Sequence, residues 1–226
     1  MKRLVTCMSA LCILGGIATS ALAVPTSLDF EGLQNFEQVL EFYNGGTGSL
    51  GSSGTNYGVS FGTGALALID EDAGGTGNFA NEPTGDTIAF WLSGGSLLMN
   101  VAGGFDTGFS FFYSSSTAAV VSVYDGLNAT GNLLATINLG AQHNANGCTG
   151  DPTGEFCNWT PIGVTFVGVA RSVDFSGTAD QTGYDNITFG SATPVGVPEP
   201  ASVLLLGFGL AGIALWRQCQ VGKQVG

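Results

Sequence analysis

The chain contains a single histidine, His143, so a serine or cysteine nucleophile activated by a histidine base would have to use it. His143 lies in the polar run AQHNANGC, and no G-x-S-x-G nucleophile elbow precedes it. One histidine also supplies too few ligands for an ordinary zinc site. We therefore expect His143 to be a solvated loop residue, and we expect the protein not to be an enzyme.

Carboxylates offer two other kinds of chemistry, glycoside hydrolysis and calcium binding. No spacing selects one acid and one base among them, so a glycoside hydrolase is a remote alternative. The densest run, Asp70-Glu71-Asp72, is either a solvated turn before Gly74-Gly75 or a loop calcium site, although it lacks the spacing of an EF-hand.

A second calcium candidate joins the two ends of the exported domain. Asp29 and Glu31 lie on the predicted first strand and Asp185 on the last, and first and last strands commonly neighbour each other in jelly rolls. Asp185 shares parity with Ile187, which predicts an inward carboxylate that needs a partner. A calcium ion, backbone N–H groups and Arg171 are the alternatives. No other cofactor is expected.

Two cysteines, Cys148 and Cys157, bracket the turn-rich run CTGDPTGEFC. An even pair in an exported protein predicts a disulfide, and the alternative is two free thiols.

The first 23 residues have the order of a secretory signal peptide. Lys2 and Arg3 precede an apolar run, which ends at Ala21 and Ala23, the small residues of an A-x-A cleavage site. Signal peptidase would leave Val24 as the new N-terminus. The alternative is a buried N-terminal helix.

The other end of the chain carries sixteen uncharged residues, 201–216. As a helix they would extend over roughly 24 Å, which is slightly short of a bilayer core. Arg217 and Lys223 follow, so the end of the chain should stay in the cytoplasm. We expect a single C-terminal transmembrane helix at about 201–216. The alternative is a buried core helix.

This tail resembles the PEP-CTERM sorting region of exported bacterial proteins. The resemblance rests on Pro198-Glu199-Pro200, the apolar helix and the basic end, within residues 198–226. It implies that an exosortase-like membrane protease recognises the tail and removes it. It also implies anchoring in the inner membrane during sorting and a final place at the cell surface or in the extracellular matrix.

Removing both ends leaves a strongly acidic domain. Residues 24–196 keep sixteen carboxylates and one basic residue, Arg171, for a net charge of about −15. Such a domain should be repelled by nucleic acid and by anionic lipid. Solubility outside the cell and binding of divalent cations are the two interpretations of this charge.

Short apolar or alternating runs between Gly, Asn, Asp and Ser clusters predict an all-β domain, a β-sandwich or jelly roll over residues 24–192, with 193–197 as a linker. We expect the turn at Asp125-Gly126 to join Val121–Tyr124 and Leu133–Leu139 in a hairpin. A helical turn is an alternative for Gln34–Leu40. The expected strands are Ser27–Phe30, Val39–Tyr43, Gly58–Phe61, Ala65–Ile69, Thr87–Trp91, Ser96–Val101, Gly108–Tyr113, Ala119–Tyr124, Leu133–Leu139, Gly163–Val167, Ser172–Phe175 and Tyr184–Phe189.

The domain is also similar to ectodomains that precede PEP-CTERM tails, through SLDFEG, YDGLNATGNLL and SVDFSGTADQTGYDNITFG. This resemblance implies no particular activity. We expect a structural or adhesive protein of an exopolysaccharide or biofilm matrix. The alternative is a lectin-like carbohydrate-binding module, assisted by calcium, with exposed aromatic side chains stacking on polysaccharide. An aromatic row beside a concave sheet would favour that alternative, and a flat polar face would count against it.

Overall fold

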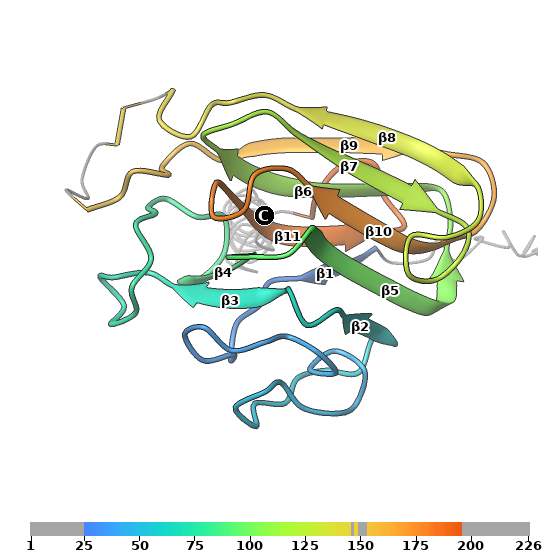
Figure 1. Ribbon diagram of the computed structural model, residues 1–226, viewed down its shortest axis with the longest axis horizontal. Helices are drawn as coiled ribbons and strands as arrows, with labels where there is room; N and C mark the ends of the chain where they lie inside the picture. Colours follow the sequence, from blue (N-terminus) through green and yellow to red (C-terminus); the bar gives the residue numbers. More distant parts are fainter. Residues whose placement is uncertain (1–24, 146, 149–152, 196–226) are drawn as a thin grey trace, which may run out of the picture.

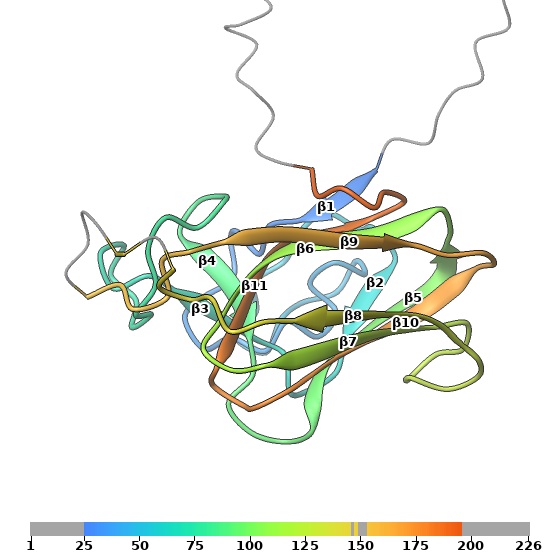
Figure 2. The same cartoon turned by 90° about the horizontal axis from the view of Figure 1, so that it is seen from above.

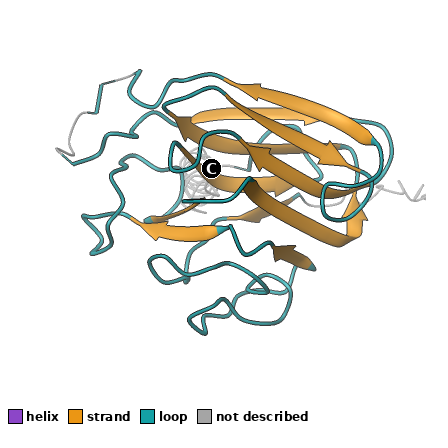
Figure 3. Cartoon of the chain, in the orientation of Figure 1, coloured by secondary structure: helices purple, strands orange, loops and turns teal. Residues whose placement is uncertain are grey.

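The computed structural model describes residues 25–145, 147–148 and 153–195, and every structural statement below concerns these residues. They form eleven β-strands and no helix (Figure 3), which confirms the all-β prediction. The strands are β1 (Thr26–Leu28), β2 (Val59–Phe61), β3 (Leu66–Ile69), β4 (Thr87–Phe90), β5 (Ser96–Phe105), β6 (Gly108–Ser115), β7 (Ala119–Tyr124), β8 (Leu133–Leu139), β9 (Thr160–Thr165), β10 (Ala170–Ser176) and β11 (Thr182–Phe189).

The strands form two antiparallel sheets in the described part of the chain (Figure 1). Sheet A has the order β3-β4-β11-β6-β9, and β1 pairs with β11 as a sixth strand. Sheet B has the order β2-β5-β10-β7-β8. The chain passes from one sheet to the other at most connections after β4, so strands close in sequence cover each other across the core.

The two sheets pack face to face through aromatic side chains. Phe175 of sheet B lies 4.8 Å from Tyr184 and 5.6 Å from Phe111 of sheet A, measured between ring centroids. All three are fully buried. Such edge-on aromatic contacts add to the free energy gained by burying apolar area.

Eleven of the twelve predicted strands overlap an observed strand, and β7 pairs with β8 as expected. Alternation also holds in β7 and β10, where Val121, Val123, Val173 and Phe175 are buried. The exception is Val39–Tyr43, which forms turns rather than a strand. Leu40 has a φ of 44°, and Phe42 N–H donates to Val39 O, so this apolar run reaches the core without strand pairing. No helical turn forms at 34–40 either.

The first and last strands are neighbours, as the sequence predicted. Thr26 pairs with Phe189 and Leu28 with Ile187. After β11 the chain folds back, and Val195 N–H donates to Thr188 Oγ1. The two ends of the described chain therefore lie on the same side of the domain, beside β11 (Figure 2).

No helix in the described residues is long and apolar enough to cross a membrane. The predicted signal peptide and the predicted helix at 201–216 lie outside the described residues, and the predicted domain limits stay predictions.

Candidate functional site

The predicted sorting and cleavage residues, Pro198, Glu199, Pro200, Ala21 and Ala23, lie outside the described part of the chain. The other predicted site residues fall in two places. Asp29, Glu31 and Asp185 lie where β1, β4 and β11 meet, and Cys148 and Cys157 lie in the connection between β8 and β9.

Asp185 is fully buried, and its carboxylate is held by the segment between β3 and β4. Its Oδ2 accepts hydrogen bonds from the Thr84 N–H and from Thr84 Oγ1, both at 2.9 Å. Its Oδ1 accepts from the Asn186 N–H at 2.6 Å. Backbone N–H groups and a hydroxyl are thus its partners in the structure, whereas Arg171 lies near Asp125.

The prediction that the side chains of Asp185 and Ile187 point to the same face of the last strand was wrong. A β-bulge lies between Asp185 and Thr188, and Asn186 adopts a φ of 48°. The extra residue breaks the alternation, so Tyr184 and Ile187 both join the hydrophobic core. Asp185 is buried, as predicted, but it is covered by the segment that carries Thr84.

Glu31 and Asp29 approach the same place from the end of β1. Glu31 Oε1 accepts hydrogen bonds from the N–H groups of Asp86 and Thr87 at 3.0 and 2.8 Å. Asp29 Oδ1 accepts from the hydroxyl of Tyr43, at 3.4 Å. We call the carboxylates of Asp29, Glu31, Glu82 and Asp185 the acidic junction.

Burial and mutual repulsion make the acidic junction electrostatically costly. Burial, more than the nearby Asp29, raises the pKa of Asp185 to about 8. Burial, followed by repulsion from neighbouring carboxylates, raises the pKa of Glu82 to about 7. Burial also raises the pKa of Glu31. The carboxyl groups of Asp185, Glu82 and Glu31 therefore favour a bound proton or a nearby cation over three free negative charges.

No group of three His, Cys, Asp or Glu side chains in the described residues is arranged to hold a metal ion. An ion at the junction would need neutral oxygen ligands as well, which calcium accepts readily. An adjoining cavity of about 240 Å³ offers such oxygens beside Asp29 and Glu31, from the hydroxyls of Ser27, Ser53 and Thr55. The calcium site stays a prediction.

A second cavity, of about 260 Å³, lies among the loops near the start of β11. It far exceeds the roughly 10–15 Å³ that one water molecule requires. We call it the loop pocket. Its walls bring together two carboxylates, two amides, a hydroxyl and two rings, contributed by Asn78, Ser116, His143, Glu155, Phe156, Asp180 and Gln181.

The disulfide holds one wall of the loop pocket. Cys148 and Cys157 are joined as predicted, with Cα atoms 5.2 Å apart. Cys157 directly follows Glu155 and Phe156, and its N–H donates to His143 O at 2.9 Å. His143 lies in a turn and its ring is 5.1 Å from the ring of Phe156. It is only half-buried, in keeping with the predicted loop position.

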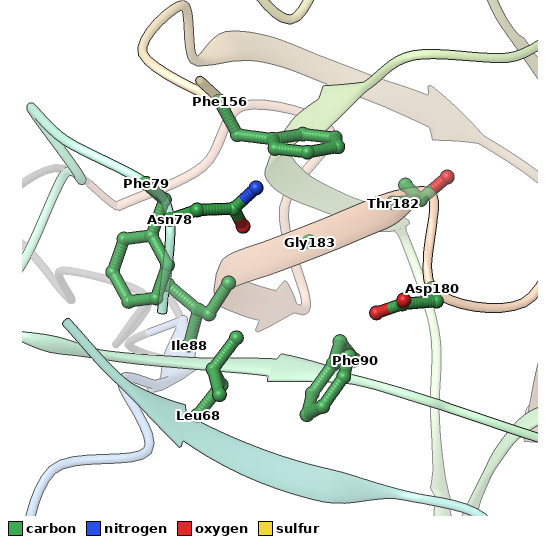
Figure 4. Close-up of a pocket in the computed structure, with 9 residues that line it drawn as sticks. All are labelled: Leu68, Asn78, Phe79, Ile88, Phe90, Phe156, Asp180, Thr182 and Gly183. Atoms are coloured by element: carbon green, nitrogen blue, oxygen red, sulfur yellow. The ribbon is translucent and has the colours of Figure 1, made fainter. Parts of the chain in front are cut away.

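A smaller side pocket of about 30 Å³ adjoins the loop pocket, and Figure 4 shows its lining. Asn78, Phe156 and Asp180 line both cavities. The remaining walls come from the outer face of sheet A and the segment that covers it, namely Leu68, Phe79, Ile88, Phe90, Thr182 and Gly183.

Sequence reasoning missed the loop pocket, because its residues come from four separate connections. The one available signal was the position of Glu155-Phe156 next to a predicted disulfide cysteine. Asn78, Asp180 and Gln181 belong to polar turns that look like any others in this Gly-rich sequence.

The outer face of sheet B offers no comparable aromatic site in the described residues. In the strand register of sheet B, Asp174 lies beside Ser122, and Ser122 lies beside Thr136. Tyr124 is the aromatic side chain on this face. The polar character of these side chains counts against a sugar platform on the sheet.

Among solved structures, the chain is similar to the K2 cleaved adhesin domain of Lys-gingipain, with 12% identity, a TM-score of 0.44, and coverage of 73% of this chain and 97% of that one. It is also similar to a family 6 carbohydrate-binding module, with 16% identity, a TM-score of 0.35, and coverage of 57% and 85%. A carbohydrate-binding module of Cellvibrio mixtus lichenase 5A, solved with cellotriose, gives 13% identity, a TM-score of 0.33, and coverage of 56% and 86%. At such scores these likenesses assign no ligand to this chain.

No curated protein matches the sequence. The PEP-CTERM protein-sorting motif matches residues 196–218, which include Pro198-Glu199-Pro200 and Arg217. The chain therefore carries the sorting motif of PEP-CTERM proteins, which implies secretion and membrane-anchored processing in the manner of an exosortase substrate.

Proposed function

We propose that this protein is an adhesive component of a cell-surface or extracellular polysaccharide matrix and that it binds sugar in the loop pocket. An exosortase releases it from the inner membrane, and the acidic domain then remains in an exopolysaccharide or biofilm layer. The observation that carries this proposal is the loop pocket itself, where polar groups and aromatic rings converge on one open cavity.

The chemistry of the pocket suits a sugar ring. Glu155 and Asp180 can accept hydrogen bonds from ring hydroxyls, and bonds to charged groups are the stronger kind. The amides of Asn78 and Gln181 can both donate and accept. The ring of Phe156 offers an apolar face for the C–H groups of a pyranose. A cavity of about 260 Å³ has room for about one ring.

The fold suits a presented binding module. In our proposal the strands β4 to β11 form a jelly roll, because β4-β11-β6-β9 and β5-β10-β7-β8 are the two layers that such a roll requires. Both ends of the described chain lie beside β11, whereas the loop pocket lies at the opposite end of that strand, near Asp180 and Gln181.

We take the loop pocket to be a binding site and not a catalytic one. Glu155 and Asp180 are both solvent-exposed. The acid of a glycosidase is instead held in surroundings that keep it protonated.

The test uses the secreted protein and a glycan array with neutral, amino-sugar and uronic-acid polysaccharides. We expect binding to non-anionic glycans and no binding to uronic acids, because the domain and its pocket are negatively charged. Glu155→Gln should weaken binding, while Asp106→Asn, an exposed carboxylate outside the pocket, should not. Binding that is unaffected by Glu155→Gln, or no binding to any glycan, would reject the proposal.

A second proposal concerns the acidic junction, where the fully buried Asp185 has no basic partner among the described residues. We propose that calcium binds beside Asp29, Glu31 and Asp185 and stabilises the fold. At a hundredfold excess over its dissociation constant it would add about 2.7 kcal/mol to the free energy of unfolding. Thermal unfolding with calcium and with a chelator tests this, and equal midpoints would exclude the site.

A further inference from the structure

The side pocket shown in Figure 4 opens from the loop pocket and differs from it in character. The loop pocket is mostly polar, whereas the side pocket has an apolar floor made by Leu68, Ile88 and Phe90. The latter two are nearly fully buried. Its volume of about 30 Å³ is about twice what one water molecule requires. That volume suits a small substituent, not a second sugar ring.

Gly183 of β11 lines this pocket, and its surroundings leave no room for a side chain. A Cβ atom at this position would lie 2.7 Å from Ile88 Cδ1 and 3.2 Å from Trp159 Cη2. Any other residue at this position would therefore have to displace the side chain of Ile88 or Trp159. The place of Ile88 in the floor of the side pocket thus depends on the absence of a side chain at position 183.

Two polar groups stand at the mouth of the side pocket, and they have opposite hydrogen-bonding characters. Figure 4 shows the amide of Asn78 and the carboxylate of Asp180 on facing sides of the cavity, with the ring of Phe156 above them. Asn78 Nδ2 makes only a long contact of 3.4 Å to Glu155 Oε2, so it can donate to a ligand. Asp180 can accept from one.

An apolar floor with one donor and one acceptor at its mouth matches a secondary amide that ends in a methyl group. Resting on the proposed sugar-binding function, we propose that the side pocket recognises the acetamido group of an N-acetylated hexosamine. The sugar ring lies in the loop pocket, the methyl group lies against the apolar floor, the amide N–H donates to Asp180, and the carbonyl oxygen accepts from Asn78.

Other substituents in place of the acetamido group would fit the apolar floor and the two polar groups less well. A hydroxyl group leaves the apolar floor unfilled, and its single oxygen has to serve Asn78 and Asp180 on facing sides of the cavity. A free ammonium pairs with Asp180 but brings no methyl group. A carboxylate is repelled by Asp180 and Glu155.

The decisive experiment compares chitotetraose with cellotetraose by calorimetric titration of the mature secreted protein. These two oligosaccharides have the same linkage and differ only in bearing acetamido or hydroxyl groups. Because one buried methyl group and one added hydrogen bond distinguish them, we expect about tenfold tighter binding of chitotetraose. The fully deacetylated tetramer is the third arm, and we expect it to bind more weakly than chitotetraose.

Two variants test the placement of the acetamido group. Gly183→Ala displaces Ile88 in the floor, and Asp180→Gly removes the acceptor while retaining a residue that tolerates the φ of 62° at this position. Each should abolish the preference for chitotetraose. Gly62→Ala is the matched control, because a Cβ there would lie 3.5 Å from Leu98 Cβ, at an ordinary contact distance. If Gly183→Ala fails to fold, Asp180→Gly still decides the question.

The outcomes separate this inference from the proposed function. Equal affinity for chitotetraose and cellotetraose, or a preference that survives Asp180→Gly, would overturn the acetamido assignment and leave the sugar-binding proposal standing. No binding of chitotetraose would likewise overturn the acetamido assignment, and no binding to any glycan on the array would overturn both.

Discussion

The acidic junction and the loop pocket are both rich in carboxylates, but they hold them in opposite ways. At the junction Asp185 is fully buried and accepts hydrogen bonds from Thr84 and Asn186. In the loop pocket Glu155 and Asp180 are exposed to solvent. Burial raises the pKa of Asp185 to about 8, so folding makes this carboxylate resist ionisation.

The difference separates carboxylates that determine the stability of the fold from carboxylates that can bind a ligand. A buried carboxylate is already engaged by the protein, and changing it alters the free energy of unfolding. An exposed carboxylate in a cavity costs little to maintain and can pair with an incoming hydroxyl or amide. Variants at the junction should therefore change stability without changing sugar affinity, and variants in the pocket should do the reverse.

The largest expected effect is a loss of stability as pH rises. The folded-state pKa of Asp185, about 8, lies above the unfolded value near 3.8, so the folded state binds more protons between these values. Glu82, with a folded pKa of about 7, acts in the same direction. In the presence of a chelator, the free energy of unfolding should fall by at most about 5 kcal/mol from pH 4 to pH 8 on account of Asp185.

Asp185→Asn tests the source of this pH dependence. The neutral amide should flatten the stability curve between pH 5 and pH 8, whereas Asp106→Asn should leave it unchanged. Chemical denaturation at each pH gives the comparison. A wild-type protein that is more stable at pH 8 than at pH 5 without calcium would contradict the burial of an ionisable Asp185.

The next largest effect should follow loss of the disulfide. Replacing Cys148 and Cys157 by serine removes a crosslink over a loop of about ten residues, which in the chain-entropy model costs about 2.7 kcal/mol. Because the same loop carries Glu155 and Phe156, sugar affinity should fall as well. Denaturant titration and glycan binding of the double variant measure both effects. Unchanged affinity would show that the pocket wall does not depend on the crosslink.

The smallest effect on stability is expected for Glu155→Gln. Its side chain is exposed, so the free energy of unfolding should change by less than about 0.5 kcal/mol while affinity for glycans falls. Asp185→Asn, measured at pH 5, should show the opposite pattern. A Glu155→Gln variant that unfolds more easily but binds normally would break the distinction between the two regions.

Most of the strand framework was predictable, because alternation and turn residues are local signals. Val121 and Val123 alternate with Ser122 and Tyr124, and Asp125-Gly126 marks the turn into β8. The bulge at Asp185–Thr188 was not predictable, since it depends on how β11 meets β1, β4 and β6.

The region between β1 and β2 shows the limit of local patterns. Val39–Tyr43 looks like a strand, but its backbone is organised by a buried carboxylate. Glu37 accepts hydrogen bonds from the N–H groups of Gln34, Leu50 and Ser52 at 2.8 to 3.0 Å. Burial opposes ionisation of Glu37, but these bonds outweigh it and lower its pKa. Contacts across such sequence distances carry no periodic signal.

The residues of the candidate sites also differ in how far the sequence could predict their arrangement. The disulfide pair and the meeting of Asp29 and Glu31 with Asp185 follow from cysteine number and from the pairing of first and last strands. The loop pocket depends on four connections folding together. Asn78 and Asp180 are brought face to face only by the tertiary structure (Figure 4).

The most direct test of a sugar-binding loop pocket is the mapping of chemical-shift changes on the mature secreted protein during titration with chitotetraose and cellotetraose. The account predicts that the largest changes occur at Asn78, Glu155, Phe156 and Asp180, with little change at Asp174 and Ser122 on the outer face of sheet B. Changes centred on that outer face, or no changes with either oligosaccharide, would contradict it.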